Sequence, residues 1–205
     1  MALWLVATLV SLGLGLQVVP IPTVPEGFVL GSANSTKVLD VFYDHLCSDS
    51  AAAFPGLWTY WQANQSWLKL VVHIFPLPFH HYTFMVSQAG KYVQLNYPQL
   101  FISYTEYMFN NQETYLYDAL NWTYPQIQQQ LAQDTYQATG ISTSEVLTAL
   151  NNTAVNWATR VSWKYATTRG MSGTPNYLLN GVWAPDAAVL ETAEDWANWF
   201  SSAPY

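Results

Sequence analysis

Cysteine and charge are both scarce in this 205-residue chain. Cys47 is the only cysteine, so no disulfide can form within the chain and stability must come from its core. Charged side chains make up 9% of the residues, against about a quarter in typical globular domains. The 13 acidic residues outnumber the 6 basic ones, which leaves a net charge of −7 and no basic stripe for phosphates. We therefore expect neither nucleic acid nor an anionic membrane surface as a partner.

Apolar residues are plentiful, since 51% of the chain is hydrophobic and 16% is aromatic. This composition excludes a disordered chain, because it can bury enough apolar surface to offset the entropy of ordering. The length fits one core of useful size, at most with an insertion. The sequence leaves the oligomeric state open.

The N-terminal stretch MALWLVATLVSLGLGL has no charged side chain, and small residues lie near its end at Gly13 and Gly15. This pattern predicts a secretory signal peptide over residues 1–16. The usual basic start is missing and the apolar run approaches the ~17–20 residues that span a bilayer, so an uncleaved N-terminal anchor is the alternative. No other segment is long and apolar enough to span, and we expect no membrane association after cleavage.

Four N-glycosylation sequons accompany this segment, at Asn34, Asn64, Asn121 and Asn151. Together they predict a glycoprotein that is secreted or resides in the lumen of the endoplasmic reticulum. The C-terminal SSAPY lacks a retention signal of the Lys-Asp-Glu-Leu type, which favours secretion.

Cys47 lies between a predicted strand and a predicted helix. Short apolar runs over 27–31 and 37–44 indicate strands, and 49–64 places aromatic and aliphatic residues at helical spacing. The continuous run over 67–75 reads as a strand buried on both faces. The order strand, helix, strand predicts a βαβ unit, with Ser48 or Asp49 capping the helix and Pro55 kinking it.

Helical patterns dominate residues 81–169, where a capping box is predicted at Ser142 and Glu145. Pro125 is expected to open a helix and Gly140 to close it. Asn180-Gly181 then predicts a hairpin turn, and 192–200 predicts a last helix.

This order of elements resembles the DsbA-like branch of the thioredoxin superfamily. VLDVFYDHLCSDS is similar to the family's strand and Cys-x-x-Cys helix, with Asp44 three residues before the cysteine. IFPLPFHH resembles its second strand and Pro-Leu-Pro segment, with His80 at a position that is commonly histidine. MSGTPNYLLNG resembles the loop that presents a cis-proline, here Pro175.

The resemblance implies an α/β thioredoxin fold, βαβ–ββα, with a DsbA-like helical insertion. Residues 27–80 and 170–200 would form the thioredoxin-like domain, and 81–169 would form the insertion. It further implies Cys47 as the nucleophile and Thr174 and Pro175 as the partner-binding loop.

The sequence departs from the family's pattern at the residues that are expected to carry the chemistry. Ser50 replaces the resolving cysteine, so net dithiol oxidation within one chain is excluded. Val41 replaces a buried acid, and Asp49 stands where a histidine often stabilises the thiolate. The helix N-terminus, Ser50 and possible inward placement of His45 favour a thiolate, whereas Asp44 and Asp49 oppose it. A reactive and an inert Cys47 both remain open.

Three functions follow from these observations. The favoured one is monothiol thiol-disulfide exchange through Cys47 with protein or peptide thiols. The alternatives are a non-catalytic peptide-binding protein, with Trp58, Trp61 or Phe79 lining a groove, and a glutathione-binding protein similar to glutathione transferases. Apart from possible glutathione, no cofactor is expected.

The remaining candidate residues favour structural roles. No metal is expected, because His80 and His81 lack companions at ligand spacing. His73 is interpreted as a core histidine. Asp40, Asp44 and Asp49 are interpreted as solvated loop charges.

Overall fold

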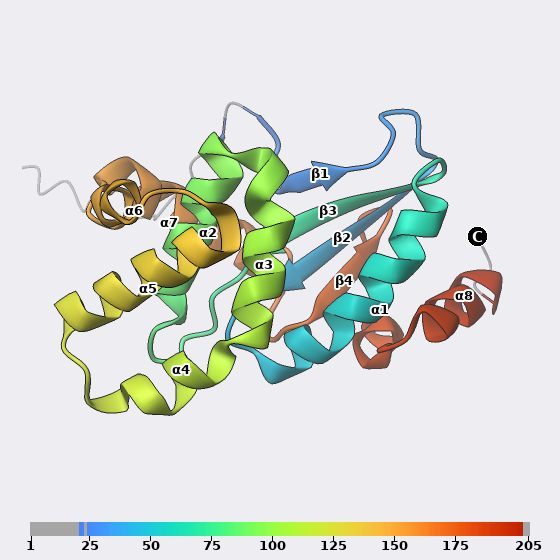
Figure 1. The fold of residues 1–205 in the computed structure, drawn as a ribbon. Coiled ribbons are helices and arrows are strands. Elements are labelled where there is room, and N and C mark those ends of the chain that lie inside the picture. The colour runs from blue at the N-terminus through green and yellow to red at the C-terminus, as the bar shows by residue number, and fades with distance from the viewer. Residues whose placement is uncertain (1–20, 23, 203–205) are drawn as a thin grey trace, which may run out of the picture.

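The structure is a computed structural model that describes residues 21–22 and 24–202 (Figure 1). The predicted signal peptide over residues 1–16 lies outside the described residues, as does the choice between cleavage and an anchor. Within the described ranges, none of the helices has the length and hydropathy needed to cross a membrane.

A five-stranded mixed sheet forms the centre of the molecule, in the order β1-β3-β2-β4-β5 (Figure 1). β2 and β3 are parallel, and the other neighbouring pairs are antiparallel. The strands are β1 (Phe28–Leu30), β2 (Lys37–Tyr43), β3 (Leu68–Ile74), β4 (Asn176–Leu179) and β5 (Val182–Trp183).

The predicted βαβ unit is confirmed, because α1 (Ser48–Asn64) connects the parallel strands β2 and β3. α1 begins directly after Cys47, which occupies the N-cap position. The predicted cap by Ser48 or Asp49 is wrong: both residues already belong to the helix, and no side chain caps it. The helix continues through Pro55.

Helices occupy the chain between β3 and β4, where the sequence predicted them. They are α2 (Thr83–Asn96), α3 (Phe101–Asn110), α4 (Gln112–Leu116), α5 (Tyr124–Thr139), α6 (Thr143–Leu150) and α7 (Thr153–Thr168). Short 3₁₀ turns lie at Pro98–Leu100 and Asp118–Asn121. As predicted, Pro125 lies in the first turn of α5, and Gly140 ends it in the left-handed conformation.

The capping box predicted at Ser142 and Glu145 is wrong. Ser142 is the N-cap residue of α6, but no side-chain hydrogen bond caps the helix. The Glu145 carboxylate instead accepts hydrogen bonds from the hydroxyls of Tyr92 and Tyr97. Two phenol donors, one in α2 and one at the residue that follows it, therefore take the place of the local backbone amide.

Alternating residues of the strands face two different helical layers. Leu39 and Val41 belong to the main core, which includes residues of α1 and α8 (Ala193–Ser202), and these two helices lie together at one side of the sheet (Figure 1). Phe42 points the other way and packs with Leu178 and with Ala166 of α7. The insertion therefore supplies a cover for the second sheet face.

The predicted hairpin joins β4 to β5. Asn180 and Gly181 have φ angles of 51° and 80°, which are the left-handed values that a two-residue Asn-Gly hairpin turn requires. The turn leads through a 3₁₀ segment, Pro185–Val189, to α8. Trp196 and Trp199 of α8 are buried.

Candidate active site around Cys47

Cys47 lies at the junction of β2 and α1, where its backbone precedes the first turn of a 17-residue helix. Its side chain is 6% exposed. The thiol donates a hydrogen bond to the backbone carbonyl oxygen of Thr174 at 3.1 Å. The cysteine and the loop before β4, distant in sequence, therefore meet through a direct sulfur contact.

The loop that meets Cys47 contains the proline identified from the sequence. The peptide bond between Thr174 and Pro175 is cis. Thr174 is itself buried, and its hydroxyl has no hydrogen-bond partner among the described residues. Both residues that the resemblance assigns to partner binding thus lie beside the thiol.

Ser50 lies one helical turn after Cys47 and is fully buried. The structure shows no hydrogen bond between the two residues, since the thiol is directed to Thr174. The Ser50 hydroxyl has no partner in the described part of the chain. A buried hydroxyl without a partner is costly, which leaves Ser50 with a donor that a thiolate could accept.

Apolar side chains surround the thiol on its other sides. Cys47 belongs to a small buried cluster that extends from β2 to α7 and the loop after it. The cluster contains Phe42, Phe75, Leu77, Ala166, Met171 and Leu178. The sulfur therefore lies in a largely apolar environment.

Asp44 is buried, so its interpretation as a solvated loop charge was wrong. Its side chain is 0% exposed and its two oxygens accept four hydrogen bonds. The donors are the backbone amides of Leu46 and Leu77 at 2.8 and 2.9 Å, the His80 imidazole at 2.7 Å and the Thr83 hydroxyl. Asp44 therefore fastens the loop before Cys47 to the segment that opens the insertion.

His45 is buried, but it does not reach the thiol. Its Nε2 lies 3.3 Å from the Thr105 hydroxyl, and its ring packs edge-on against Tyr104 and Phe101. Burial lowers the pKa of His45 to about 4, with the charge of Asp44 partly opposing the shift. The imidazole is therefore neutral at pH 7 and acts as a packed core group.

Gln112 of α4 is a positioning residue that the sequence did not reveal. Its amide donates hydrogen bonds to the backbone carbonyl oxygens of His45 at 3.0 Å and Cys47 at 2.9 Å. Gln112 is itself buried. Nothing in the sequence near Gln112 identifies this contact, because it joins residues 65 and 67 positions apart.

A buried ionic cluster lies on the α7 side of the sheet. His73 on β3 contacts Asp40 at 2.9 Å and also Glu26, while Glu26 pairs with Lys91 at 2.9 Å and accepts from the Ser162 hydroxyl. The interpretation of His73 as a satisfied core histidine is confirmed. Asp40 was wrongly interpreted as solvated, because it belongs to this cluster.

The charges of the cluster stabilise one another. Burial alone would raise the pKa of Glu26, but Lys91 and His73 outweigh it and hold the value at about 2. Burial also opposes the charged form of His73, but hydrogen bonds to Asp40 and Glu26 raise its pKa above the ordinary value. His73 therefore favours the imidazolium form, which donates from both nitrogens.

The remaining predicted site residues are spread over the surface and core. Asp49 is exposed, as predicted, and accepts a hydrogen bond from Ser48 at 3.4 Å. Trp61 is buried in the core and donates to the Leu68 carbonyl, so it does not line a groove. Phe79 is 71% exposed. Trp58 is partly buried against the main core.

The four sequons differ in their surroundings. Asn34 and Asn121 are exposed, and their side chains bond to no described residue. Asn64 is half-buried; its amide donates to the Tyr60 carbonyl at 2.7 Å and accepts from Trp67 at 2.9 Å. The fourth, Asn151, is exposed but donates to the Leu147 carbonyl at 2.8 Å.

Over residues 21–22 and 24–202, no group of three or more His, Cys, Asp or Glu side chains has a geometry that could hold a metal ion.

Solved structures with the same architecture belong to the family identified from the motifs. A protein described as a protein-disulfide isomerase from Pseudomonas syringae is 17% identical, with a TM-score of 0.68 over 84% of this chain and 97% of that chain. Oxidised BdbD from Bacillus subtilis is 15% identical, with a TM-score of 0.67 over 85% and 91%. DsbA from Chlamydia trachomatis is 14% identical, with a TM-score of 0.66 over 89% and 94%.

Neither the protein-family models nor the curated proteins compared with the sequence gave a match. The structural similarity is nevertheless extensive, because it covers more than four fifths of both chains in each pair. The chain therefore has the DsbA-like thioredoxin fold that its motifs predicted, with its single cysteine between β2 and α1.

Proposed function

We propose that this chain exchanges disulfides with protein or peptide thiols through Cys47 alone. One observation carries the proposal: the only cysteine lies at a helix N-terminus, with its sulfur 3.1 Å from the Thr174 carbonyl, beside Pro175. The positive end of the helix dipole lies beside the sulfur, and the neighbouring loop offers backbone groups to an extended partner. The similarity to thiol-disulfide oxidoreductase structures supports the same chemistry.

The reaction is a disulfide interchange without net oxidation or reduction. The Cys47 thiolate attacks one sulfur of a partner disulfide, forms a mixed disulfide with it and releases the other sulfur as a thiolate. A second thiolate from solution then attacks the mixed disulfide, forms a new disulfide with the partner and returns Cys47 as a thiolate. Glutathione is the small thiol that we propose for this second step.

Ser50 and the loop before β4 take separate roles in this proposal. When Cys47 loses its proton, its hydrogen bond to the Thr174 carbonyl is lost as well, and the buried Ser50 hydroxyl becomes the donor to the sulfur. Thr174 and Pro175 hold the partner in an extended conformation next to the sulfur. Asp44 and Gln112 act as positioning residues, because they fix the backbone on which Cys47 sits.

An oxidising compartment suits this chemistry, since partner disulfides persist there. We propose that the protein is secreted or resides in the lumen of the endoplasmic reticulum. The apolar N-terminal stretch and the four sequons support this location.

The test is the rate at which Cys47 forms a mixed disulfide with glutathione disulfide, followed by intact mass. Without a second cysteine the adduct has no internal route of release, so it should accumulate. We expect the native protein to react faster per thiol than the same chain unfolded in urea at the same pH, and Ser50→Ala to slow the native reaction. A native rate below the unfolded rate would overturn the proposal.

A second function is favoured by the burial of the sulfur. The 6% exposure of Cys47 and its apolar neighbours suit a packed side chain in a binding protein that does no chemistry. In that protein the loop at Thr174 and Pro175 would recognise a peptide. Cys47→Ala would then leave partner affinity unchanged, whereas the exchange function requires the loss of every covalent adduct.

A further inference from the structure

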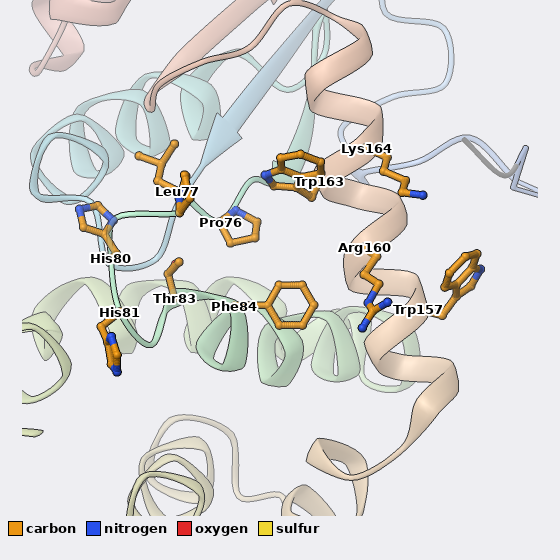
Figure 2. Close-up of a pocket in the computed structure, with 11 residues that line it drawn as sticks. Pro76, Leu77, His80, His81, Thr83, Phe84, Trp157, Arg160, Trp163 and Lys164 are labelled. Atoms are coloured by element: carbon orange, nitrogen blue, oxygen red, sulfur yellow. The ribbon is translucent and has the colours of Figure 1, made fainter. Parts of the chain in front are cut away.

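A pocket of about 580 Å³ opens between α2 and α7, in front of the segment that follows β3 (Figure 2). Its volume falls within the ~300–1,000 Å³ of small-molecule sites. It is lined by Pro76, Leu77, Pro78, His80, His81, Thr83, Phe84, Trp157, Arg160, Trp163 and Lys164. The chemistry proposed for Cys47 does not involve this pocket.

Flat apolar groups form much of the lining. Figure 2 shows the Phe84 ring extending from α2 toward α7, where Trp163 lies close to Pro76. Trp163 and Trp157 are 39% and 49% exposed, which is unusual for the largest apolar side chain. Rings and prolines on facing walls favour a planar apolar group between them.

Two cations of α7 supply the charge of the pocket. Trp157, Arg160 and Lys164 recur at spacings of three and four, so they form one stripe along the helix. The Lys164 ammonium lies 5.6 Å from the centre of the Trp157 ring. Neither Arg160 nor Lys164 forms an ion pair with a described residue. By contrast, Lys91 is paired with Glu26.

The positive charge of the pocket is opposite in sign to the net charge of the chain. Two of the six basic residues line the pocket, whereas the chain carries 13 acidic ones. Among the described residues that line it, none is Asp or Glu. The nearby Asp44 carboxylate is buried and already accepts four hydrogen bonds. An anion is therefore the complementary ligand.

We propose that this pocket binds a small aromatic carboxylate. The ring lies between Phe84 and Trp163, and the carboxylate is bound by the guanidinium of Arg160, which can donate two parallel hydrogen bonds. Lys164, which also lines the pocket, adds a second positive charge. The site is independent of the chemistry at Cys47, although Leu77 and His80 of its lining also donate to Asp44.

The test is calorimetric titration of the folded protein with 2-naphthoate at about 0.15 M salt, where charges beyond ~8 Å are screened. We expect saturable binding at one site. The neutral 2-naphthamide, which keeps the ring, and octanoate, which keeps the charge, should each bind at least about tenfold more weakly. Equal affinity for either analogue would overturn the proposal, as would the absence of detectable heat.

Variants locate the site. Arg160→Gln should weaken 2-naphthoate binding on the order of tenfold or more, because it removes the bidentate donor. Arg169→Gln is the matched control, since this exposed arginine belongs to the end of the same helix, outside the lining, and affinity should be unchanged. Equal losses in both variants would show a general charge effect and overturn the site.

Trp163→Ala tests the apolar wall separately and should also reduce affinity, with folding checked by circular dichroism. Cys47→Ser should bind 2-naphthoate like the wild type. If Cys47→Ser binds but forms no adduct, the pocket is supported whatever the result of the exchange assay. Failure of the exchange proposal and failure of the pocket proposal therefore give different results.

Discussion

The Asp44 carboxylate accepts a hydrogen bond from the His80 imidazole at 2.7 Å, and this contact joins the end of β2 to the start of the helical insertion. The same carboxylate holds the backbone amides of Leu46 and Leu77. The buried Asp44 side chain therefore combines a local turn contact, at Leu46, with contacts to the segment that opens the insertion. The Gln112 amide also holds this loop, through the carbonyls of His45 and Cys47.

Asp44→Asn should lower the free energy of unfolding by about 3 kcal/mol, because the amide places a donor where buried N–H groups need an acceptor. Urea denaturation at pH 7 measures the loss. Asp49→Asn is the matched control, since Asp49 is exposed in the same segment, and its change should stay within about 0.5 kcal/mol. Similar losses in both variants would contradict the structural role of Asp44.

Gln112→Leu should destabilise the protein by about 1–2 kcal/mol, because the His45 carbonyl loses its donor in a buried site. The Cys47 carbonyl keeps a hydrogen bond from the Ala51 amide at 3.1 Å, which limits the cost. We also expect faster native-state alkylation of Cys47 by iodoacetamide as its backbone loosens. Gln129→Leu, at an exposed position of α5, should change neither property.

Most elements could be predicted because their signals are local. The alternation and length of β2, α1 and β3, the Asn180-Gly181 turn and the spacing of Trp196 and Trp199 are each contained within one segment. The capping box predicted for α6 failed because its glutamate has tertiary partners. Glu145 bonds to the hydroxyls of Tyr92 and Tyr97, which no local rule anticipates.

The surroundings of the site were less predictable, because they depend on contacts between distant residues. The burial of Asp44 follows from donors that the insertion places above it, such as Thr83. The pocket was missed for the same reason. The stripe of Trp157, Arg160 and Lys164 is visible in the sequence, but its facing wall at Phe84 requires the fold.

His45 should make stability fall on mild acidification. Its folded-state pKa is about 4 because it is buried, whereas the unfolded residue titrates near 6.5. Below pH 6.5 the unfolded chain binds a proton that the folded chain does not, so stability present above that pH is lost as pH falls toward 4. The loss should reach about 3 kcal/mol.

Urea denaturation at pH 4.5 and pH 7 checks this pH dependence. His45→Phe keeps an aromatic ring beside Tyr104 and removes the titration, so its stability should fall less between the two pH values. His73 has the opposite effect on the pH dependence of stability, because its raised pKa contributes stability that is lost as pH rises. If the stability of His45→Phe falls between pH 7 and pH 4.5 as much as that of the wild type, the pH dependence does not come from His45.

Glu26→Gln should cost about 3–5 kcal/mol at pH 7, because it leaves Lys91 charged and unpaired inside the protein. The pKa of Glu26 is lowered to about 2, so its contribution is present above the unfolded value of 4.5 and is lost as pH falls toward 2. The cost of the substitution should shrink in the same range. Glu194→Gln, an exposed control, should stay within about 0.5 kcal/mol.

Glycan occupancy should follow the side-chain contacts of the sequons. When the full chain is expressed in a eukaryotic secretory host, we expect glycans at Asn34 and Asn121, which are exposed and bond to no described residue. Asn64 should carry less, because a glycan would replace an amide hydrogen that bonds to Tyr60 and crowd the Trp67 indole.

Enzymatic deglycosylation in heavy-oxygen water, followed by peptide mass spectrometry, measures occupancy at each asparagine. Asn64→Gln tests the reason for the difference, because it should destabilise the protein through the lost contacts, whereas Asn34→Gln should not. Full occupancy at Asn64 in a stably folded protein would contradict the structural argument. Empty sites at both Asn34 and Asn121 would contradict the proposed passage through the secretory pathway, since both are accessible in the fold.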